Sequence, residues 1–280
     1  MDIKRILQKH GFYFKKAYGQ NFLTDEFLLD DIVTSAGITK EDTVIEIGCG
    51  AGTLTRAIAK HAGRVIGYEI DTKLTGILDE MLFGFDNVEI IFEDIMKQNI
   101  SEIEKDFKGG YYVVANLPYY ITTPILMKFL EESKYVKGLV VTVQKEVALR
   151  LAANENTADY GAITAMINLV GDAYLTKHIG REQFLPPPSV DSAVVKIVIN
   201  RDKFKPKSIE LYREMVKVAF GNRRKTLCNN LMNSLKLTRA QAEEVLSNCG
   251  IDLLARGETL SAEKFVQLSD YVYDLRRKNG

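Results

Sequence analysis

The sequence predicts an α/β fold: a doubly wound, mostly parallel sheet of the Rossmann-like kind, with a small all-α domain after it. Two observations predict it. Short, β-branched and nearly all-apolar segments alternate with helical patterns, as is typical of strands buried on both faces of a parallel sheet. After about residue 200 only helical patterns remain. With 280 residues, 46% of them hydrophobic, the chain can form a substantial core without disulfides or metal.

Five segments have the composition of buried parallel strands. They are residues 43–47, 64–70, 88–93, 111–116 and 138–144. Helical periodicity follows the first, second and fourth of these strands, at 54–59, 74–81 and 125–130. This alternation predicts one parallel sheet with helices on its faces. Two more strand candidates, 172–179 and 192–199, have no clear helix between them and are compatible with an antiparallel hairpin at the sheet edge.

A domain boundary is expected near residue 202. The segment 200–208 is polar and carries Pro206, which is typical of a linker. Four helices are expected after it, at 208–220, 225–233, 238–248 and 261–277. Thr238 and Ser261 are suited to cap helices, and Gly250 and Gly257 to break them. The sequence therefore predicts a first domain over 1–202 and a helical domain over 203–280.

The charges are distributed unevenly along the chain. There are 37 basic and 37 acidic residues in total, but residues 201–280 carry a net charge of +6 and residues 1–20 a net charge of +4. The stretch between them carries −10. This distribution, with basic terminal segments on either side of an acidic central segment, favours contact between the terminal segments and a polyanion. The alternative is a solvated surface on which like charges happen to cluster.

Several protein classes are disfavoured. The N-terminus has no apolar run of signal-peptide length, and no segment approaches the roughly 18 apolar residues of a membrane span, so we expect a cytosolic protein. The three cysteines and three histidines are scattered and form no CxxC pair. Neither a disulfide framework nor a metal site is expected. For the oligomeric state, a monomer is the default expectation.

A glycine-rich turn follows the first strand and points to a nucleoside ligand. It reads Glu46-Ile47-Gly48-Cys49-Gly50-Ala51-Gly52, which lacks the G-x-G-x-x-G spacing of NAD and FAD sites. Glu69, 21 positions after Gly48, is placed to bind ribose hydroxyls, and Asp94 ends the next strand, where it can accept from an adenine amino group. S-adenosylmethionine fits this set of groups. Alone, the glycines would be compatible with a simple tight turn.

The segment Asn116-Leu117-Pro118-Tyr119-Tyr120 follows the fourth strand and suits chemistry at a nucleobase amino group. The lone pair of such a nitrogen is delocalised into the ring, so it is a poor nucleophile until acceptors hold its hydrogens. Asn116 Oδ1 and the Leu117 carbonyl supply two acceptors, while the proline fixes the turn and Tyr119 can stack on the base. Catalysis would depend mainly on in-line alignment. The alternative is an Asn-Pro turn with core tyrosines.

These motifs resemble the KsgA (RsmA) family of ribosomal RNA adenine N6,N6-dimethyltransferases. The resemblance covers nearly everything from Lys15 to the C-terminus. Its motifs are Tyr18 to Leu23, Glu46 to Gly52, Glu69 to Asp71, Asn116 to Tyr119, Phe184 to Ser192 and Phe220 to Leu227. It implies a class I S-adenosylmethionine-dependent methyltransferase that modifies two adjacent adenosines in the 3′-terminal hairpin loop of small-subunit (16S) rRNA. It also implies a role in small-subunit biogenesis, a partly assembled subunit as partner, S-adenosylhomocysteine as product, and no metal.

The resemblance also implies roles for individual residues. The implied cofactor-binding residues are Gln20, Asn21, Leu23, Gly48, Gly50, Glu69, Ile70, Asp94, Ile95 and Asn116. The implied catalytic residues are Asn116, Leu117, Pro118, Tyr119 and Phe184, with the two aromatic side chains as walls around a flipped or unpaired adenine. The implied rRNA-binding residues are Arg223, Arg224 and Lys225.

Two other functions compete with this interpretation. The first is dimethylation of large-subunit rRNA by the related macrolide-resistance family, in which the fourth motif commonly begins Gly-Asn-Ile-Pro-Tyr, whereas this chain has Ala115 before Asn116. The second is a non-catalytic role as an assembly checkpoint or transcription factor on the same fold. The presence of Glu69, Asp94, Asn116 and Tyr119 favours an intact enzyme.

Overall fold

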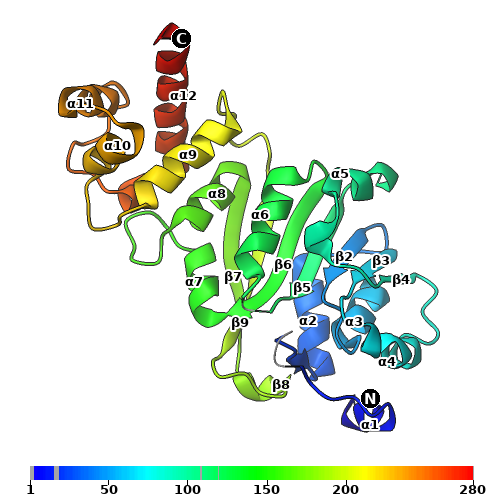
Figure 1. Ribbon diagram of the computed structural model, residues 1–280. Coiled ribbons are helices and arrows are strands. Elements are labelled where there is room, and N and C mark those ends of the chain that lie inside the picture. The colour runs from blue at the N-terminus through cyan, green and yellow to red at the C-terminus, as the bar shows by residue number, and fades with distance from the viewer. Residues whose placement is uncertain (1–2, 16–18, 108, 119, 280) are drawn as a thin grey trace. The chain divides into compact units, whose positions relative to one another are not determined.

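The computed structural model describes residues 3–15, 19–107, 109–118 and 120–279 (Figure 1). The chain divides into two compact units. The first contains Met1–Ala148 and Tyr174–Ile199, and the second contains Leu149–Ala173 and Asn200–Gly280.

The first unit is built on one sheet with the strand order β4-β3-β2-β5-β6-β9-β7. Its parallel strands are β2 (Thr43–Ile47), β3 (Arg64–Tyr68), β4 (Val88–Ile91), β5 (Tyr111–Asn116) and β6 (Val136–Gln144). Strand β9 (Ser192–Ile199) runs antiparallel to β6, and β7 (Gly171–Ile179) forms the edge beside β9. The expected α/β fold is confirmed, and the two last strands are neighbours at the sheet edge, as expected.

The register of the central strands places their carboxyl ends together. Ile47, the last residue of β2, pairs with Tyr68 of β3 on one side and with Ala115 of β5 on the other. The loops that follow these three strands therefore emerge at the same edge of the sheet, where ligands of open α/β sheets bind.

Helices cover both faces of this sheet. Helices α2 (Glu26–Ala36) and α3 (Thr53–His61) share one apolar core with Val44 of β2 and Val114 of β5. Successive residues of a strand point to opposite faces, so Tyr111 of β5 lies on the other face. There its ring contacts Phe129 of α6 (Thr122–Glu132) edge-on, with the ring centres 6.4 Å apart.

The remaining helices of this unit are short. They are α1 (Ile3–Lys9), α4 (Thr75–Met81), α5 (Ile100–Ile103) and α7 (Lys145–Leu151), the last of which runs into the second unit.

A second, two-stranded sheet joins the N-terminal segment to the loop between β7 and β9. In it β1 (Phe22–Leu23) pairs antiparallel with β8 (Phe184–Leu185), and Leu23 lies opposite Phe184. The sequence did not predict this sheet. Strands of two residues carry no readable periodicity, and their pairing depends on tertiary contacts.

The second unit is helical. Its helices are α8 (Ala162–Val170), α9 (Ile209–Phe220), α10 (Leu227–Leu235), α11 (Arg239–Asn248) and α12 (Ala262–Asn279). The last four agree with the expected helices to within two residues at each end. Thr238 caps α11 as expected, since its hydroxyl accepts a hydrogen bond from the Gln241 amide.

Residues 149–173 belong to this helical unit, whereas the sequence placed them in the first domain. The cause is buried hydrogen bonding that the sequence does not show. Tyr212 on α9 donates its hydroxyl proton to the Ala165 carbonyl at 2.8 Å, and Tyr160 donates to the Leu260 carbonyl at 2.9 Å. The division of functions between 1–202 and 203–280 stays a prediction.

In the part of the chain that the structure describes, we find no helix with both the length and the apolar character that spanning a bilayer requires.

Candidate active site

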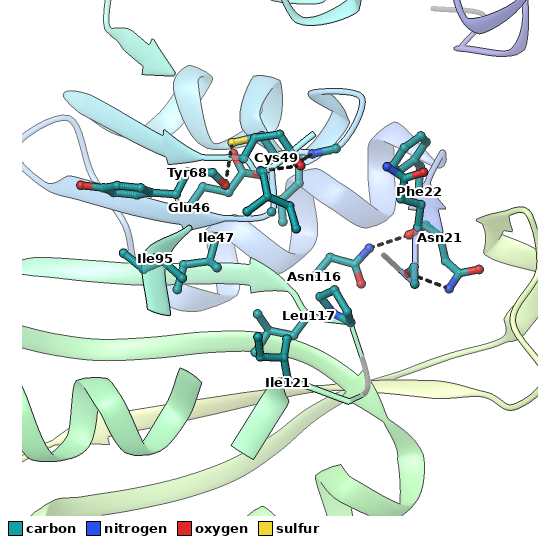
Figure 2. Close-up of a pocket in the computed structure, with 18 of the residues that line it drawn as sticks. Asn21, Phe22, Glu46, Ile47, Cys49, Tyr68, Ile95, Asn116, Leu117 and Ile121 are labelled. Atoms are coloured by element: carbon teal, nitrogen blue, oxygen red, sulfur yellow. Dashed lines mark hydrogen bonds between the residues drawn. The ribbon is translucent and has the colours of Figure 1, made fainter. Parts of the chain in front are cut away.

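A deep cavity opens at the sheet edge where β2, β3 and β5 end (Figure 2). It encloses about 1020 Å³ of space between protein atoms, its open mouth included. Most of its lining comes from five segments of the first unit, and Thr53, Leu54, Tyr120, Ile121, Ile125 and Phe184 complete it. The segments are residues 19–23, 46–50, 68–70, 93–95 and 116–118. The structure thus brings together the expected cofactor residues and most of the expected catalytic ones.

The glycines after β2 leave room for a ligand. Gly48 has a φ of +76°, and no atom lies within 4 Å of the position that a Cβ would occupy there. Gly50 has a φ of +55° and serves a different purpose, because a Cβ at this position would lie 2.7 Å from Cε1 of Phe22. The first glycine therefore keeps the cavity open, and the second allows the Phe22 ring to pack on the loop.

Glu69 is held by main-chain amides. Its Oε2 accepts from the Gly50 amide, and its Oε1 accepts from the amides of Ile70 and Asp71, each at 2.8 Å. A carboxylate has about four acceptor sites, so one remains, on Oε2. Burial raises the pKa of Glu69, and the three amide hydrogen bonds partly oppose that shift. The group is a rigid acceptor for a hydroxyl donor in the cavity.

Asp94, Ile95 and Ile70 line the cavity beside Glu69. Asp94 lies three residues past the end of β4 rather than at its last position, where the sequence had placed it. Its Oδ1 accepts from the Met96 amide at 2.9 Å, which fixes the direction of the carboxylate. Ile95 is buried, whereas Ile70 is 46% exposed.

Asn116 ends β5 with its side-chain amide fixed in direction (Figure 2). Its Nδ2 donates to the main-chain carbonyl of Asn21 at 2.8 Å. Because a carbonyl oxygen attracts the NH₂ group and repels the amide oxygen, Oδ1 must point the other way. Leu117 is buried, and its amide donates to the Thr142 carbonyl at 3.1 Å, which anchors the turn to β6. Pro118 lines the cavity, and Tyr119 lies outside the described residues.

The N-terminal segment contributes Gln20, Asn21 and Leu23, all of which line the cavity. Gln20 donates from Nε2 to Oδ2 of Asp71 at 3.0 Å. Leu23 is buried and pairs with Phe184, which is itself 4% exposed and lines the cavity.

Two acidic residues of this region received no role from the sequence. Asp71 anchors Gln20, and the signal that could have found it is the second acid of the Glu-Ile-Asp motif. Glu46 is fully buried beside the cavity, and its Oε2 has no hydrogen-bond partner among the described residues. Burial, with a smaller effect from nearby Glu69, raises the pKa of Glu46 to about 8. A buried carboxyl oxygen without a partner is a signal that only the structure supplies.

The expected RNA-binding residues lie in the second unit, in the turn between α9 and α10, and all three are exposed. Arg223 also has a local partner: its Nη2 donates to the carbonyls of Ala158 and Tyr160 at 2.8 and 2.9 Å. Among the described residues, the side chain of Arg223 therefore has hydrogen-bond partners within the unit that the side chains of Arg224 and Lys225 do not have.

Within the described ranges, His, Cys, Asp and Glu side chains do not gather in a group of three or more that could hold a metal ion.

Comparisons with known proteins agree on one family. The family description "Ribosomal RNA adenine dimethylase" matches residues 11–274. The protein named ribosomal RNA small subunit methyltransferase A from Bacillus pumilus is 44% identical over 274 residues, which are 95% of this chain and 94% of the relative.

Solved structures with a similar fold carry related names. A dimethyladenosine transferase from Plasmodium falciparum matches with a TM-score of 0.77 and 25% identity, over 92% of this chain and 98% of that one. The 23S rRNA methyltransferase ErmE matches with a TM-score of 0.69 and 26% identity, over 90% of this chain and all of that one.

Proposed function

Because the chain belongs to the ribosomal RNA adenine dimethylase family, we propose that its cavity binds S-adenosylmethionine beside a captured adenine of small-subunit rRNA. The chain has the class I methyltransferase fold and is an rRNA adenine dimethyltransferase. The observation that carries the site assignment is the fixed amide of Asn116, which directs Oδ1 away from Asn21 at the end of β5.

The residues of the cavity fit the cofactor. Glu69 offers its remaining acceptor site to a ribose hydroxyl, and Asp94 offers Oδ2 to the adenine amino group. The open space at Gly48 accommodates the methionine portion. When bound, the cofactor supplies a methyl carbon on a positively charged sulfur, which leaves as the neutral thioether.

Asn116 and Leu117 act on the target nitrogen. Asn116 Oδ1 and the Leu117 carbonyl accept its two hydrogens, which favours a pyramidal nitrogen with an available lone pair. Once methylated, the nitrogen would be acidic and would lose its proton to water or to Asn116. The enzyme supplies mainly alignment, so it needs no strong base.

Phe184 is one wall of the adenine pocket, and the family resemblance implies Tyr119, which lies outside the described residues, as the other. N6 of a stacked base is out of reach, so the adenine is flipped or taken from an unpaired loop. Phe184 is fixed against Leu23 by the β1–β8 pairing, which gives the pocket one rigid wall.

The target is two adjacent adenosines in the 3′-terminal hairpin loop of small-subunit rRNA. Support comes from the 44% identity to the small-subunit enzyme and from Ala115, which stands where large-subunit enzymes commonly have glycine. The fold alone does not separate the two activities, since a 23S rRNA methyltransferase is among the similar structures.

The helical unit binds the rRNA backbone. Arg224 and Lys225 contact phosphates, and Arg223 lies beside them. Residues 203–280 supply this function, residues 1–202 supply catalysis, and the enzyme acts as a cytosolic monomer that needs no metal. A partly assembled small subunit is the substrate, because the acidic stretch of the chain would repel free RNA.

Two variants test the site assignment. Asn116→Ala should abolish methyl transfer to small subunits, with the affinity for S-adenosylhomocysteine reduced far less. Glu69→Ala should weaken S-adenosylhomocysteine binding by about tenfold or more, because a buried acceptor for a hydroxyl is lost. Calorimetry and transfer of labelled methyl groups measure the two effects. Transfer by Asn116→Ala at the wild-type rate would contradict the assignment.

A further inference from the structure

Two neighbouring residues of the N-terminal segment connect the two halves of the cavity. Gln20 is tied to the cofactor side, since its Nε2 donates to Oδ2 of Asp71 at 3.0 Å. Asn21 is tied to the target side, since its carbonyl accepts from Nδ2 of Asn116 at 2.8 Å (Figure 2). A displacement of this segment would therefore reach the amide that faces the target nitrogen.

Asp71 is the anchor of the segment. It is 2% exposed, its Oδ1 accepts from Lys15 Nζ at 2.7 Å, and the Lys15 amide in turn donates to Oε1 of Gln20 at 2.8 Å. Burial alone would raise the pKa of Asp71, but the hydrogen bonds from Lys15 and Gln20 outweigh it and lower the pKa. The carboxylate is thus ionised and paired on both sides.

Asp71 and Lys15 do not line the cavity themselves, among the residues that the structure describes. The main-chain amide of Asp71 donates to Oε1 of Glu69 at 2.8 Å. That contact does not depend on the Asp71 side chain. Oδ1 of Asp71 also accepts from the Lys73 amide at 3.2 Å, a contact that an asparagine oxygen can keep. Asp71→Asn therefore removes the charge while the ribose acceptor keeps its three amide donors.

The same segment is fixed at two further points. The ring of Phe22 packs on Gly50, and Leu23 pairs with Phe184 in the small sheet. Residues 20, 21, 22 and 23 thereby contact Asp71, the target amide, the glycine loop and the pocket wall, respectively.

We propose that Asp71 is a positioning residue for methyl transfer: through Gln20 and Asn21 it holds the Asn116 amide in the orientation that presents Oδ1 to the target nitrogen. The proposal rests on the proposed function for its consequence in catalysis. Reactions that depend on alignment are sensitive to small displacements, and a misplacement of about 1 Å can cost about 100-fold in rate.

The test compares Asp71→Asn and Lys15→Met with a matched control, Lys9→Met. The control removes a lysine that is ion-paired to Glu80 at 2.8 Å, away from the cavity. Single-turnover transfer at saturating cofactor gives the rate, calorimetry gives the S-adenosylhomocysteine affinity, and nucleoside analysis gives the ratio of monomethyl to dimethyl adenosine.

We expect both Asp71→Asn and Lys15→Met to lower the transfer rate about tenfold and to enrich the monomethyl product, because a loosened amide presents its oxygen less often. S-adenosylhomocysteine affinity should change by less than about twofold, since Glu69 keeps its amide donors. The double variant should resemble either single variant, because both substitutions remove the same ion pair between Lys15 and Asp71. Lys9→Met should behave as wild type.

A second readout does not require activity. The side-chain NH₂ resonance of Asn116, assigned through its loss in Asn116→Ala, should shift and exchange faster with solvent in Asp71→Asn than in Lys9→Met. If wild-type protein transfers no methyl group to adenine, the proposed function fails, whereas this resonance still decides the role of Asp71.

Two results would overturn the proposal. One is an unchanged Asn116 resonance with rates equal to those of Lys9→Met, which would leave Asp71 a structural residue. The other is a loss of S-adenosylhomocysteine affinity as large as the loss of rate, which would show that Asp71 serves cofactor binding alone.

Discussion

The chemically important side chains of the cavity are held by main-chain groups. Glu69 accepts from three backbone amides, and Asn116 donates to a backbone carbonyl. Backbone partners cannot change rotamer, so the acceptors that face the ligands are fixed before any ligand arrives. This is the arrangement expected where alignment rather than strong acid–base chemistry supplies the catalysis.

The raised pKa of Glu46 predicts how the free energy of unfolding depends on pH. Burial raises its pKa in the folded protein to about 8, from an ordinary value of 4.5. Between these values the folded state binds more protons than the unfolded state, so this group lowers the stability of the wild type as pH rises. Glu46→Gln should remove that dependence, and its advantage over wild type in free energy of unfolding should grow between pH 5 and pH 8.

Urea denaturation of the cofactor-free proteins at pH 5, 6.5 and 8 measures this difference. A shift of one pKa unit corresponds to about 1.4 kcal/mol, so the change is well above experimental error. The same stability difference between variant and wild type at all three pH values would show that Glu46 is not buried in this way.

At the scale of elements, the parallel strands were predictable and the N-terminal segment was not. Strands such as β2 and β5 are buried on both faces, so their apolar, β-branched composition identifies them directly. The β1–β8 pairing and the Gln20–Asp71 contact join residues that are far apart in sequence, and segments this short carry no period that would reveal them. Both depend on tertiary placement.

The contact between the N-terminal segment and the glycine loop predicts a graded effect. Gly50→Ala places a Cβ 2.7 Å from the Phe22 ring at a φ of +55°. Gly37→Ala is the matched control, because Gly37 has a φ of +78° with no atom within 4 Å of its Cβ position. Each substitution costs about 1–2 kcal/mol of backbone strain, and Gly50→Ala should cost more because of the ring.

Thermal denaturation of the two variants measures this excess, and calorimetry should show weaker S-adenosylhomocysteine binding only for Gly50→Ala. Adding Phe22→Leu to Gly50→Ala should recover part of the excess, since the clashing ring is gone. Equal destabilisation by Gly50→Ala and Gly37→Ala would mean that Phe22 does not pack on the loop.

At the scale of the whole molecule, the helical unit begins earlier than the sequence indicated. The change from strand patterns to helical patterns after residue 199 can be read from the sequence. The inclusion of residues 149–173 in the helical unit depends on contacts such as that of Tyr212 with Ala165. Periodicity shows which helices exist and does not show which of them pack together. The residues expected to bind RNA follow from charge and resemblance rather than from periodicity.

The salt dependence of rRNA affinity should distinguish the roles of the three basic residues between α9 and α10. Arg224→Ala and Lys225→Ala should each lower the slope of log affinity for rRNA against log salt by about 0.7–0.9, because each loses one phosphate contact. Arg223→Ala should mainly lower the melting temperature, since it loses its hydrogen bonds to Ala158 and Tyr160. If Arg223→Ala left the melting temperature unchanged and reduced the salt slope of rRNA affinity more than the other two variants, Arg223 would be the main phosphate contact and the assignment would be wrong.

The central claim, dimethylation of adenosine in small-subunit rRNA, is tested most directly by transfer of labelled methyl groups. Unmethylated small subunits, large subunits and their naked rRNAs are the substrates, and the modified nucleosides and their positions are identified afterwards. We predict N6,N6-dimethyladenosine at two adjacent positions of the small-subunit 3′-terminal hairpin, and none in any preparation treated with Asn116→Ala. Label in large-subunit rRNA, or tight rRNA binding without transfer, would contradict the account.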